Sequence, residues 1–252
     1  MPLSNCNVGL LRCGAQPSSS HSFKQETMDT AFVIRFHYGP SDRRFDWRFA
    51  YFRSVVLPRI LSQTVNEFEI AIWCNPWHRD MFLALSEKIR VFGVRPEADG
   101  FVRPEDVERA KNYHIDFTYW RDVVGLPPYR IQVGLDSDDL IRKDYLERIY
   151  QEVSKSRSSS LHVCFQPMIF NLENLTQYDF KAIYGPEAGS PFFAIFQNEV
   201  DGYIFSYEQS HLKLPKLFAN SVKVEPGYCW FTIHDSNAST RLPSTSSPIL
   251  NP

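Results

Sequence analysis

IQVGLDSDDLI, residues 131–141, is a short apolar run that ends in three carboxylates within four positions: Asp136, Asp138 and Asp139. Carboxylates this close repel one another and raise each other's pKa, and a cation among them relieves that cost. Alternation at the end of a strand places Asp136 and Asp138 on one side and turns Asp139 away. Oxygen ligands suit a hard divalent cation such as Mg2+ or Mn2+. The carboxyl edge of an open α/β sheet is also where such folds bind nucleotides.

Three known motifs compete for this segment. A phosphatase of the haloacid type needs Thr or Val two places after its second Asp, where this chain has Leu140. An EF-hand loop needs a polar ligand and then Gly where this chain has Leu140 and Ile141, although Glu147 does fall at the twelfth place. The third is the Asp-x-Asp (DxD) motif of nucleotide-sugar glycosyltransferases, which nothing in the segment contradicts. A purely structural alternative is a strand-to-helix turn in which Asp139 caps a helix that begins at about Leu140.

The composition is that of a globular protein with a substantial core. Of the 252 residues, 43% are hydrophobic and 15% are aromatic, and the formal net charge is -2. This length forms one large α/β domain or two small ones. The absence of a basic excess argues against a nucleic-acid partner.

Cysteine usage and hydropathy bear on the compartment. Five cysteines are scattered without a CxxC pair, at positions 6, 13, 74, 164 and 229. That pattern disfavours a zinc site or a disulfide framework and favours a reducing compartment. The first 30 residues are polar, and the apolar runs are too short to span a bilayer. We therefore expect a cytoplasmic protein without a transmembrane segment.

Strand-like apolar runs alternate with helical periodicity along the middle of the chain. Strands are expected at 31–38, 68–74, 89–94, 129–135, 161–170, 191–196 and 222–233, and helices at 45–60, 81–89, 105–113, 142–153 and 207–218. This alternation predicts a single α/β domain, residues 30–241, on a mostly parallel sheet with helices on both faces. Residues 1–29, rich in small polar residues, are expected to form a poorly ordered arm, and the Pro/Ser-rich residues 242–252 a disordered tail.

Five short motifs follow one another in a particular order. They are VIRF at 33–36, LPRILSQT at 57–64, FEIAI at 68–72, GLDSDD at 134–139 and WFTIHDSNAS at 230–239. With these motifs, residues 31–241 resemble the rhamnosyltransferase-type family of GT-A glycosyltransferases. In that family an opening strand ends in Arg-Phe, and a helix closes with a Pro and Gln-Thr before the next strand. A Leu-Asp-x-Asp-Asp segment carries the metal, and a late His-x-x-Asn segment follows.

The resemblance implies a GT-A fold, a nucleoside-diphosphate sugar as donor, a glycan hydroxyl as acceptor, and Mn2+ or Mg2+. Carried over by position, Asp136 would face the donor ribose or the metal, and Asp138 would bind the metal between the donor phosphates. His234 would be the late contact to the metal or the diphosphate. Arg35 ends the first strand at the same edge, where it could pair with the donor base or phosphate, or form a salt bridge with a nearby Asp. Three further arginines could reach a diphosphate, with the solvated surface as the alternative for at least two of them: Arg43, Arg44 and Arg48.

The catalytic base is less clear, because this chain departs from a common GT-A pattern. Many inverting members carry a Glu-Asp pair at the start of a late helix, whereas Glu208 is followed here by Gln209. Glu208 is the first choice as base, with Asp201, His211 and Glu187 also open, and a retaining mechanism would need no such base.

Two other functions stay open at this point. A nucleotidyltransferase on a similar sheet would carry a Gly-rich, basic loop after the first strand, and residues 39–44, GPSDRR, are a poor version of that loop. A non-catalytic glycan-binding module could use aromatic residues such as Tyr119 and Trp120 for stacking.

Overall fold

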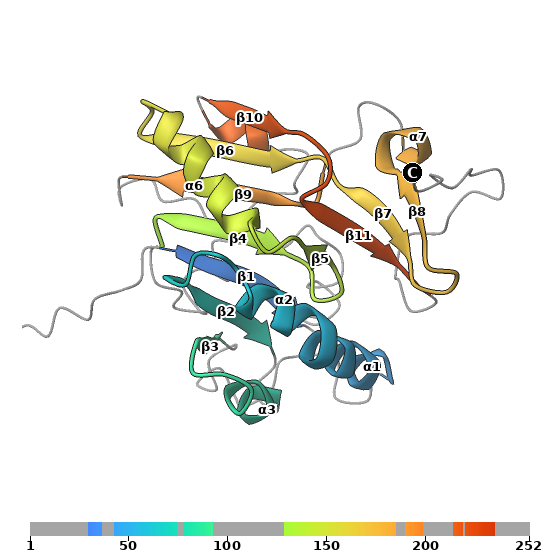
Figure 1. The fold of residues 1–252 in the computed structure, drawn as a ribbon. Helices are drawn as coiled ribbons and strands as arrows, with labels where there is room; N and C mark the ends of the chain where they lie inside the picture. The colour runs from blue at the N-terminus through green and yellow to red at the C-terminus, as the bar shows by residue number, and fades with distance from the viewer. Residues whose placement is uncertain are drawn as a thin grey trace, which may run out of the picture.

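The computed structural model describes residues 30–36, 43–74, 78–92, 129–184, 190–198, 214–218 and 220–234. These residues form two β-sheets with helices packed against them (Figure 1). The expected helices at 105–113 and 207–218 lie outside the described residues or mostly so, as do the expected arm at 1–29 and tail at 242–252.

The larger sheet has seven strands in the order β10-β6-β9-β4-β1-β2-β3. Their bounds are β1 Thr30–Phe36, β2 Glu69–Cys74, β3 Ile89–Phe92, β4 Ile131–Leu135, β6 Ser160–Phe165, β9 Phe193–Gln197 and β10 Ser221–Val224. Only β9 runs antiparallel to its neighbours, β4 and β6; the other pairings within this sheet are parallel. The predicted α/β fold with a mostly parallel central sheet is therefore confirmed.

The centre of the large sheet is apolar on both faces. Every residue of β4 and β9 is buried, and so is every residue of β1 except Arg35. Continuous apolar strands of this kind are typical of sheets covered on both sides. Close packing explains why position 134 in β4 is a glycine: a Cβ added there would lie 2.5 Å from Cζ of Phe193 on β9.

The register of the parallel strands positions the candidate site. Ile34 of β1 pairs with Leu135 of β4, so Arg35 and Asp136, which follow them, come level at the carboxyl edge of the sheet. That edge is where α/β folds of this class bind ligands.

The smaller sheet has four strands in the order β5-β11-β7-β8. They are β5 Leu140–Ile141, β7 Met168–Asn171, β8 Thr176–Asp179 and β11 Cys229–Ile233. Three chain segments pass from the large sheet into the small one, from β4 to β5, from β6 to β7 and from β10 to β11 (Figure 1). The prediction of one continuous strand at 161–170, and of another at 222–233, was wrong. Gln166 and Pro167 separate the first pair of strands, and residues 225–228 separate the second, with Gly227 at a φ of 100° that favours glycine.

The helices cover the sheet and close the core. The first helical region is α1 Arg43–Tyr51, a π-helix at Phe52–Val56 and α2 Leu57–Leu61. In the π-helical turn the N–H of Leu57 donates to the carbonyl of Phe52. The helix thus changes its hydrogen-bond spacing just before Pro58, which has no N–H to donate.

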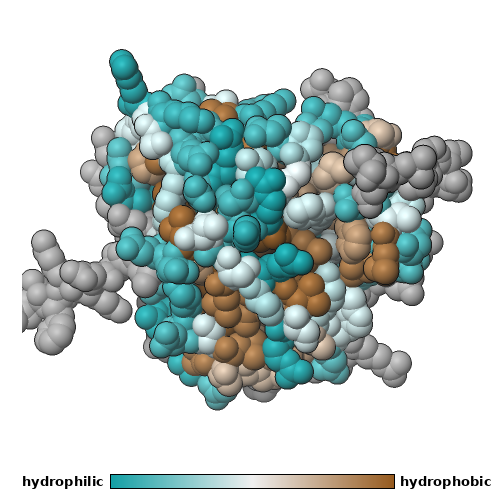
Figure 2. All heavy atoms as spheres, viewed as in Figure 1, coloured by the Kyte–Doolittle hydropathy of each residue, from teal (hydrophilic) through white to brown (hydrophobic). Residues whose placement is uncertain are grey.

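The remaining helices are α3 Arg79–Leu83, α6 Tyr145–Lys155, α7 Phe180–Tyr184 and a 3-10 turn at Leu214–Leu217. On the face shown in Figure 2, hydrophobic atoms reach the surface in the middle and lower part, and hydrophilic atoms cover much of the rest. Among the described residues, no helix is long and apolar enough to cross a membrane.

Candidate functional site

Arg35 and Asp136 form the outer part of the site. Nη2 of Arg35 lies 3.6 Å from Oδ1 of Asp136, and the two side chains are 21% and 36% exposed. Arg35 lies near the end of β1 and Asp136 directly follows β4, and these two strands run parallel and in register. The pair therefore gives the sheet edge one cation and one anion that water can reach, which suits contact with a polar ligand.

Asp138 forms the buried part of the site. Its Oδ1 lies 2.8 Å from Nη1 of Arg48, which comes from α1. Its Oδ2 accepts a hydrogen bond from Nε2 of His234 at 2.9 Å. The side chains of Asp138 and His234 are each only 5% exposed. Two residues 96 positions apart are thus brought into direct contact at the point where the two sheets meet.

The turn that carries Asp138 is fastened to β11. The backbone N–H of Thr232 donates to Oδ1 of Asp139 at 3.0 Å, and the Thr232 hydroxyl donates to the backbone carbonyl of Asp138. Strand β5 then pairs antiparallel with β11, Leu140 opposite Trp230. Since His234 follows β11 directly, this pairing places its imidazole beside Asp138.

Asp139 is buried inside this turn, and its pKa is raised well above its usual range. Burial is the largest cause, followed by the charges of Asp138 and Asp136, while the Thr232 N–H and the charge of Arg48 act in the opposite direction. Asp139 does not cap a helix at Leu140. Residues 140 and 141 form β5, and α6 begins at Tyr145 after Asp144.

The carboxylates do not alternate as expected. Asp136 and Asp138 were predicted to share one side, but residues 136–139 form a turn rather than the end of a strand. Asp136 therefore points to Arg35, whereas Asp138 points inward to Arg48 and His234.

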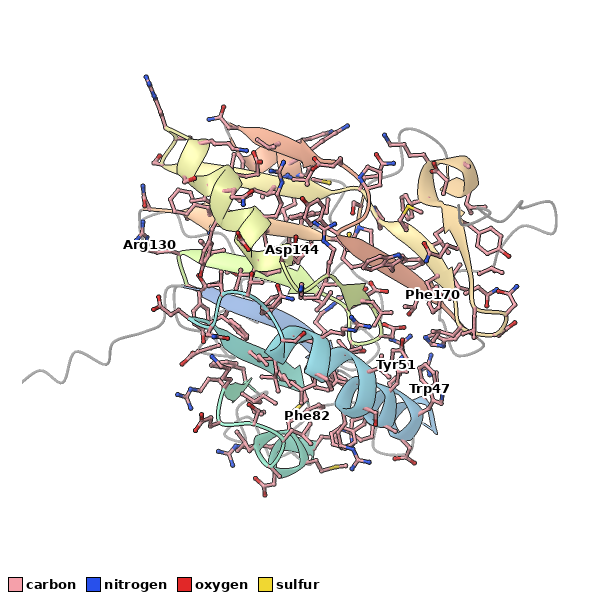
Figure 3. The ribbon with its side chains drawn as sticks, viewed as in Figure 1. Trp47, Tyr51, Phe82, Arg130, Asp144 and Phe170 are labelled. Carbon is pink, nitrogen blue, oxygen red and sulfur yellow. The ribbon has the colours of Figure 1, made fainter. Side chains whose placement is uncertain are left out.

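Helix α1 adds aromatic residues that the sequence did not single out. The rings of Trp47 and Tyr51 are stacked with centroids 5.2 Å apart, and the Trp47 ring lies 4.2 Å from that of His234. Figure 3 labels both residues on α1. Burial, and then the charges of Asp138 and Asp139, raise the pKa of Tyr51 to about 12. The i, i+4 spacing of Trp47 and Tyr51 indicated a shared helix face, but nothing in the sequence indicated which residues that face meets.

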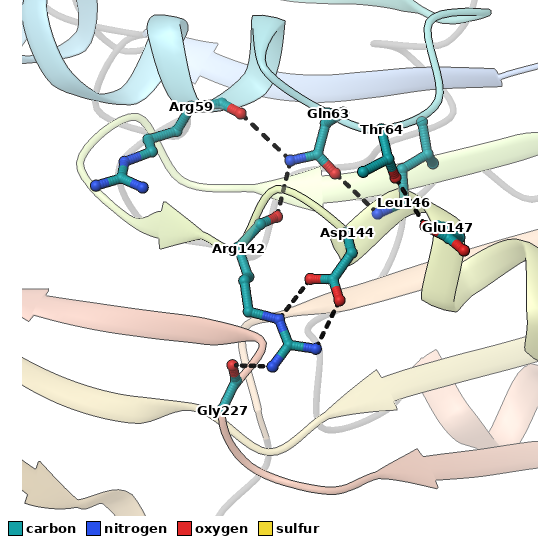
Figure 4. A network of polar contacts seen from close by, with 8 residues as sticks. All are labelled: Arg59, Gln63, Thr64, Arg142, Asp144, Leu146, Glu147 and Gly227. Carbon is teal, nitrogen blue, oxygen red and sulfur yellow. Dashed lines mark hydrogen bonds and ion pairs between the residues drawn. The ribbon is translucent and has the colours of Figure 1, made fainter.

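The Gln-Thr motif holds the segment that follows the carboxylates (Figure 4). Buried Gln63 donates to the carbonyl of Arg142 at 2.8 Å and accepts from the N–H of Leu146 at 2.9 Å. The Thr64 hydroxyl donates to Glu147 at 2.9 Å. The motif is therefore structural: Gln63 gives an acceptor to the N–H of Leu146, one of the backbone groups that the start of a helix leaves without a partner.

The donor set at Asp138 fits a cation held jointly with a substrate. Among the described residues, no three His, Cys, Asp or Glu side chains are grouped so that they could hold a metal ion, and Asp136 contacts Arg35. A carboxylate and an imidazole are nevertheless suitable ligands for Mn2+ or Mg2+, and Mg2+ is often bound through one or two carboxylates plus substrate phosphates. Such a cation would need the oxygen of Asp138 that Arg48 now contacts, and His234 would have to give up the Nε2 proton that it donates to Asp138 if that nitrogen is to be a ligand.

Several candidates from the sequence lie outside the described residues. They are Glu208 and the alternative bases Asp201, His211 and Glu187, together with Tyr119 and Trp120. Their placement relative to Asp138 stays a prediction.

Comparisons with known proteins give two kinds of match and one negative result. No curated protein matches the chain. Among solved structures, TarS residues 1–349 from S. aureus, in complex with UDP-GlcNAc, is 12% identical with a TM-score of 0.47, and the match covers 82% of this chain and 59% of that one. The same protein with UDP is 12% identical with a TM-score of 0.46, covering 81% and 60%. The chain thus spans about three fifths of these structures. The family described as "Putative rhamnosyl transferase" matches residues 7–246, and the chain belongs to this family.

Proposed function

We propose that this protein is a metal-dependent glycosyltransferase that moves a sugar from a nucleoside-diphosphate sugar to a glycan hydroxyl. Family membership over residues 7–246 supports the transferase activity. The observation that carries the proposal for this site is the contact of Asp138 with His234 at 2.9 Å. It joins a buried carboxylate and an imidazole at the carboxyl edge of an α/β sheet, where nucleotides bind in such folds.

The described residues divide into two roles. Arg35 and Asp136 are exposed enough to contact the donor, Arg35 through its phosphate or base and Asp136 through its ribose or the metal. Asp138 and His234 would hold the cation together with the diphosphate oxygens. When bound, the cation supplies Lewis-acid stabilisation of the charge that develops on the leaving diphosphate.

The chemical step exchanges one C–O bond for another. The bond between the anomeric carbon and the diphosphate breaks, the acceptor oxygen bonds to that carbon, and the acceptor hydroxyl loses its proton. In an inverting transfer, Glu208 is proposed to take that proton as a general base. Its position near the expected start of a late helix, where the family's acidic pair would fall, supports this role.

The donor sugar and the compartment are also part of the proposal. Because the family is one of rhamnosyl transferases, a rhamnosyl nucleotide is the first donor to test. The described cysteines, Cys74, Cys164 and Cys229, are all free thiols. This supports a reducing compartment such as the cytoplasm.

Release of nucleotide from a panel of nucleoside-diphosphate sugars, with and without Mn2+, tests the function. A glycosyltransferase should release the nucleoside diphosphate in a Mn2+-dependent reaction and transfer the sugar to an added glycan. Release of pyrophosphate would instead indicate a nucleotidyltransferase. Binding without any release would indicate a glycan-binding module, and either result would contradict the proposal.

A further inference from the structure

Arg48 carries a charge of the same sign as the proposed cation and contacts Asp138, the residue proposed to bind that cation. Its guanidinium reaches from α1 to Oδ1 of Asp138 at 2.8 Å and to the hydroxyl of Ser137 at 3.4 Å. The side chains of Arg48 and Asp138 are 12% and 5% exposed. The ion pair is therefore largely removed from water. In the protein interior, charges interact strongly, and a charge that loses its partner is costly.

The two ion pairs of the site balance in charge. Two guanidinium groups, those of Arg35 and Arg48, face the two carboxylates of Asp136 and Asp138 one to one. The remaining oxygen of Asp138 accepts from His234. A divalent cation that arrives alone therefore meets no excess negative charge from these two pairs, and it is repelled by the guanidinium already at Asp138. A nucleoside diphosphate brings the missing negative charge.

From this arrangement we propose that Arg48 acts as an internal counter-cation: it holds Asp138 in the donor-free protein and turns to the donor diphosphate when a divalent cation takes its place. The inference rests on the proposed function and assigns a positioning role that the family resemblance does not supply. A guanidinium is suited to this exchange, since its planar fork matches both carboxylate and phosphate oxygens. Arg48 would exchange the carboxylate of Asp138 for a phosphate oxygen of the donor at the same edge of the sheet.

The exchange makes cation and nucleotide bind cooperatively. Bound nucleotide should tighten Mn2+ binding by about fivefold to 150-fold, the usual range of coupling between two sites, and Mn2+ should tighten nucleotide binding by the same factor. In Arg48→Gln the counter-cation is absent. Mn2+ should then bind more tightly than in wild type when no nucleotide is present, while the nucleoside diphosphate binds more weakly. The Mn2+ affinity and the nucleotide affinity therefore change in opposite directions. Simple loosening of the turn would instead weaken the binding of both.

Isothermal titration calorimetry of the full chain tests the exchange. Mn2+ is titrated alone and with UDP, GDP or dTDP, into wild type, Arg48→Gln, Arg48→Lys and the matched control Arg53→Gln, whose side chain is exposed on the adjoining helical turn. Arg48→Lys keeps the charge but loses the fork, so it should fold even if Arg48→Gln does not. It should show the same two changes at smaller size, and Arg53→Gln should match wild type.

The outcomes separate the inference from the proposed function. If Mn2+ affinity without nucleotide is unchanged or lower in both Arg48 variants, the inference is overturned. If wild-type protein binds nucleotide and Mn2+ independently, it is overturned as well. If wild-type protein binds none of the nucleotides with or without Mn2+, the proposed function itself fails.

Discussion

Substituting Asp138 by Asn tests the buried ion pair and the proposed chemistry together. The change keeps the side-chain shape and leaves an oxygen for His234, but it removes the charge that Arg48 faces at 2.8 Å. Removing one partner of a buried ion pair costs about 3 to 5 kcal/mol. Against a total stability of about 5 to 15 kcal/mol, that loss is large but compatible with a folded protein. At about 2 to 4 °C per kcal/mol for a chain of this size, we expect the melting temperature to fall by at least about 6 °C.

Asp139→Asn is the matched control, because it makes the same substitution at the adjacent buried position. In wild type the Thr232 N–H donates to Oδ1 of Asp139 at 3.0 Å, and the side-chain amide oxygen of the variant can accept the same hydrogen bond. The pKa of Asp139 is raised, mainly by burial and then by the charges of Asp138 and Asp136, so the native state holds this proton more tightly than the unfolded chain does. Wild-type stability from this group is therefore present at low pH and is lost as pH rises through the folded pKa. Asp139→Asn should remove that part of the pH dependence and cost less than about 1 kcal/mol.

Urea unfolding and sugar transfer, measured on the same variants, separate folding from chemistry. Asp138→Asn should lose at least about a hundredfold in transfer rate, the scale for removing a key electrostatic group. In Arg48→Met/Asp138→Asn no buried charge is left without a partner, so much of the stability should return while transfer stays low. If Asp138→Asn unfolds like wild type, the ion pair is not as desolvated as its geometry indicates. If it transfers sugar at a near-normal rate in saturating Mn2+, Asp138 does not hold the cation.

Three further predictions concern the hydrogen bonds of Gln63, the packing of Gly134 between strands, and the catalytic base. Gln63→Met leaves the N–H of Leu146 without its acceptor, while the carbonyl of Arg142 still accepts from the Tyr145 N–H. Urea unfolding should therefore show a loss of about 1 to 3 kcal/mol, and no measurable loss would contradict the structural role of Gln63. Gly134→Ala places a Cβ 2.5 Å from the Phe193 ring and should cost about 1 to 3 kcal/mol; the cost should shrink in a Phe193→Leu background, and an equal cost there would contradict the contact. Glu208→Gln should abolish transfer while donor affinity in calorimetry is unchanged, and normal transfer would place the base elsewhere or indicate retention.

The central strands of the large sheet could be predicted because they are short, largely apolar runs that are buried on both faces. β1, β2, β4 and β9 all fall within a few residues of the ranges expected from hydrophobicity. The two long strands failed for a reason that is visible in the sequence. Pro167 and the pair Pro226-Gly227 interrupt the apolar pattern, and such residues mark turns. At these two positions the chain leaves the large sheet for the small one.

The inner site could be predicted only in part. Asp138 came from the run of carboxylates after a strand and His234 from the resemblance, but their neighbour Arg48 could be given only as one of several basic residues. Its role depends on the direction in which α1 crosses the sheet edge, and helical periodicity does not supply that direction. The pattern of alternating carboxylates was wrong because the chain turns at Asp136 and hydrogen-bonds through Asp139 to Thr232. That contact forms only when β11 is in place.

The small sheet also positions residues of the candidate site. Asp138 follows β4 of the large sheet, while Thr232 and His234 come from β11 and its end in the small sheet. Strand β11 is held in turn by β7 and by a separate apolar cluster that contains Ile169, Tyr178 and Ile233. Because neither sheet alone contains both halves of the inner site, the packing of the small sheet sets the distance between the carboxylate and the imidazole. We therefore expect a substitution in that cluster to change the affinity for the cation and the nucleotide, although the cluster contains no charged residue of the site.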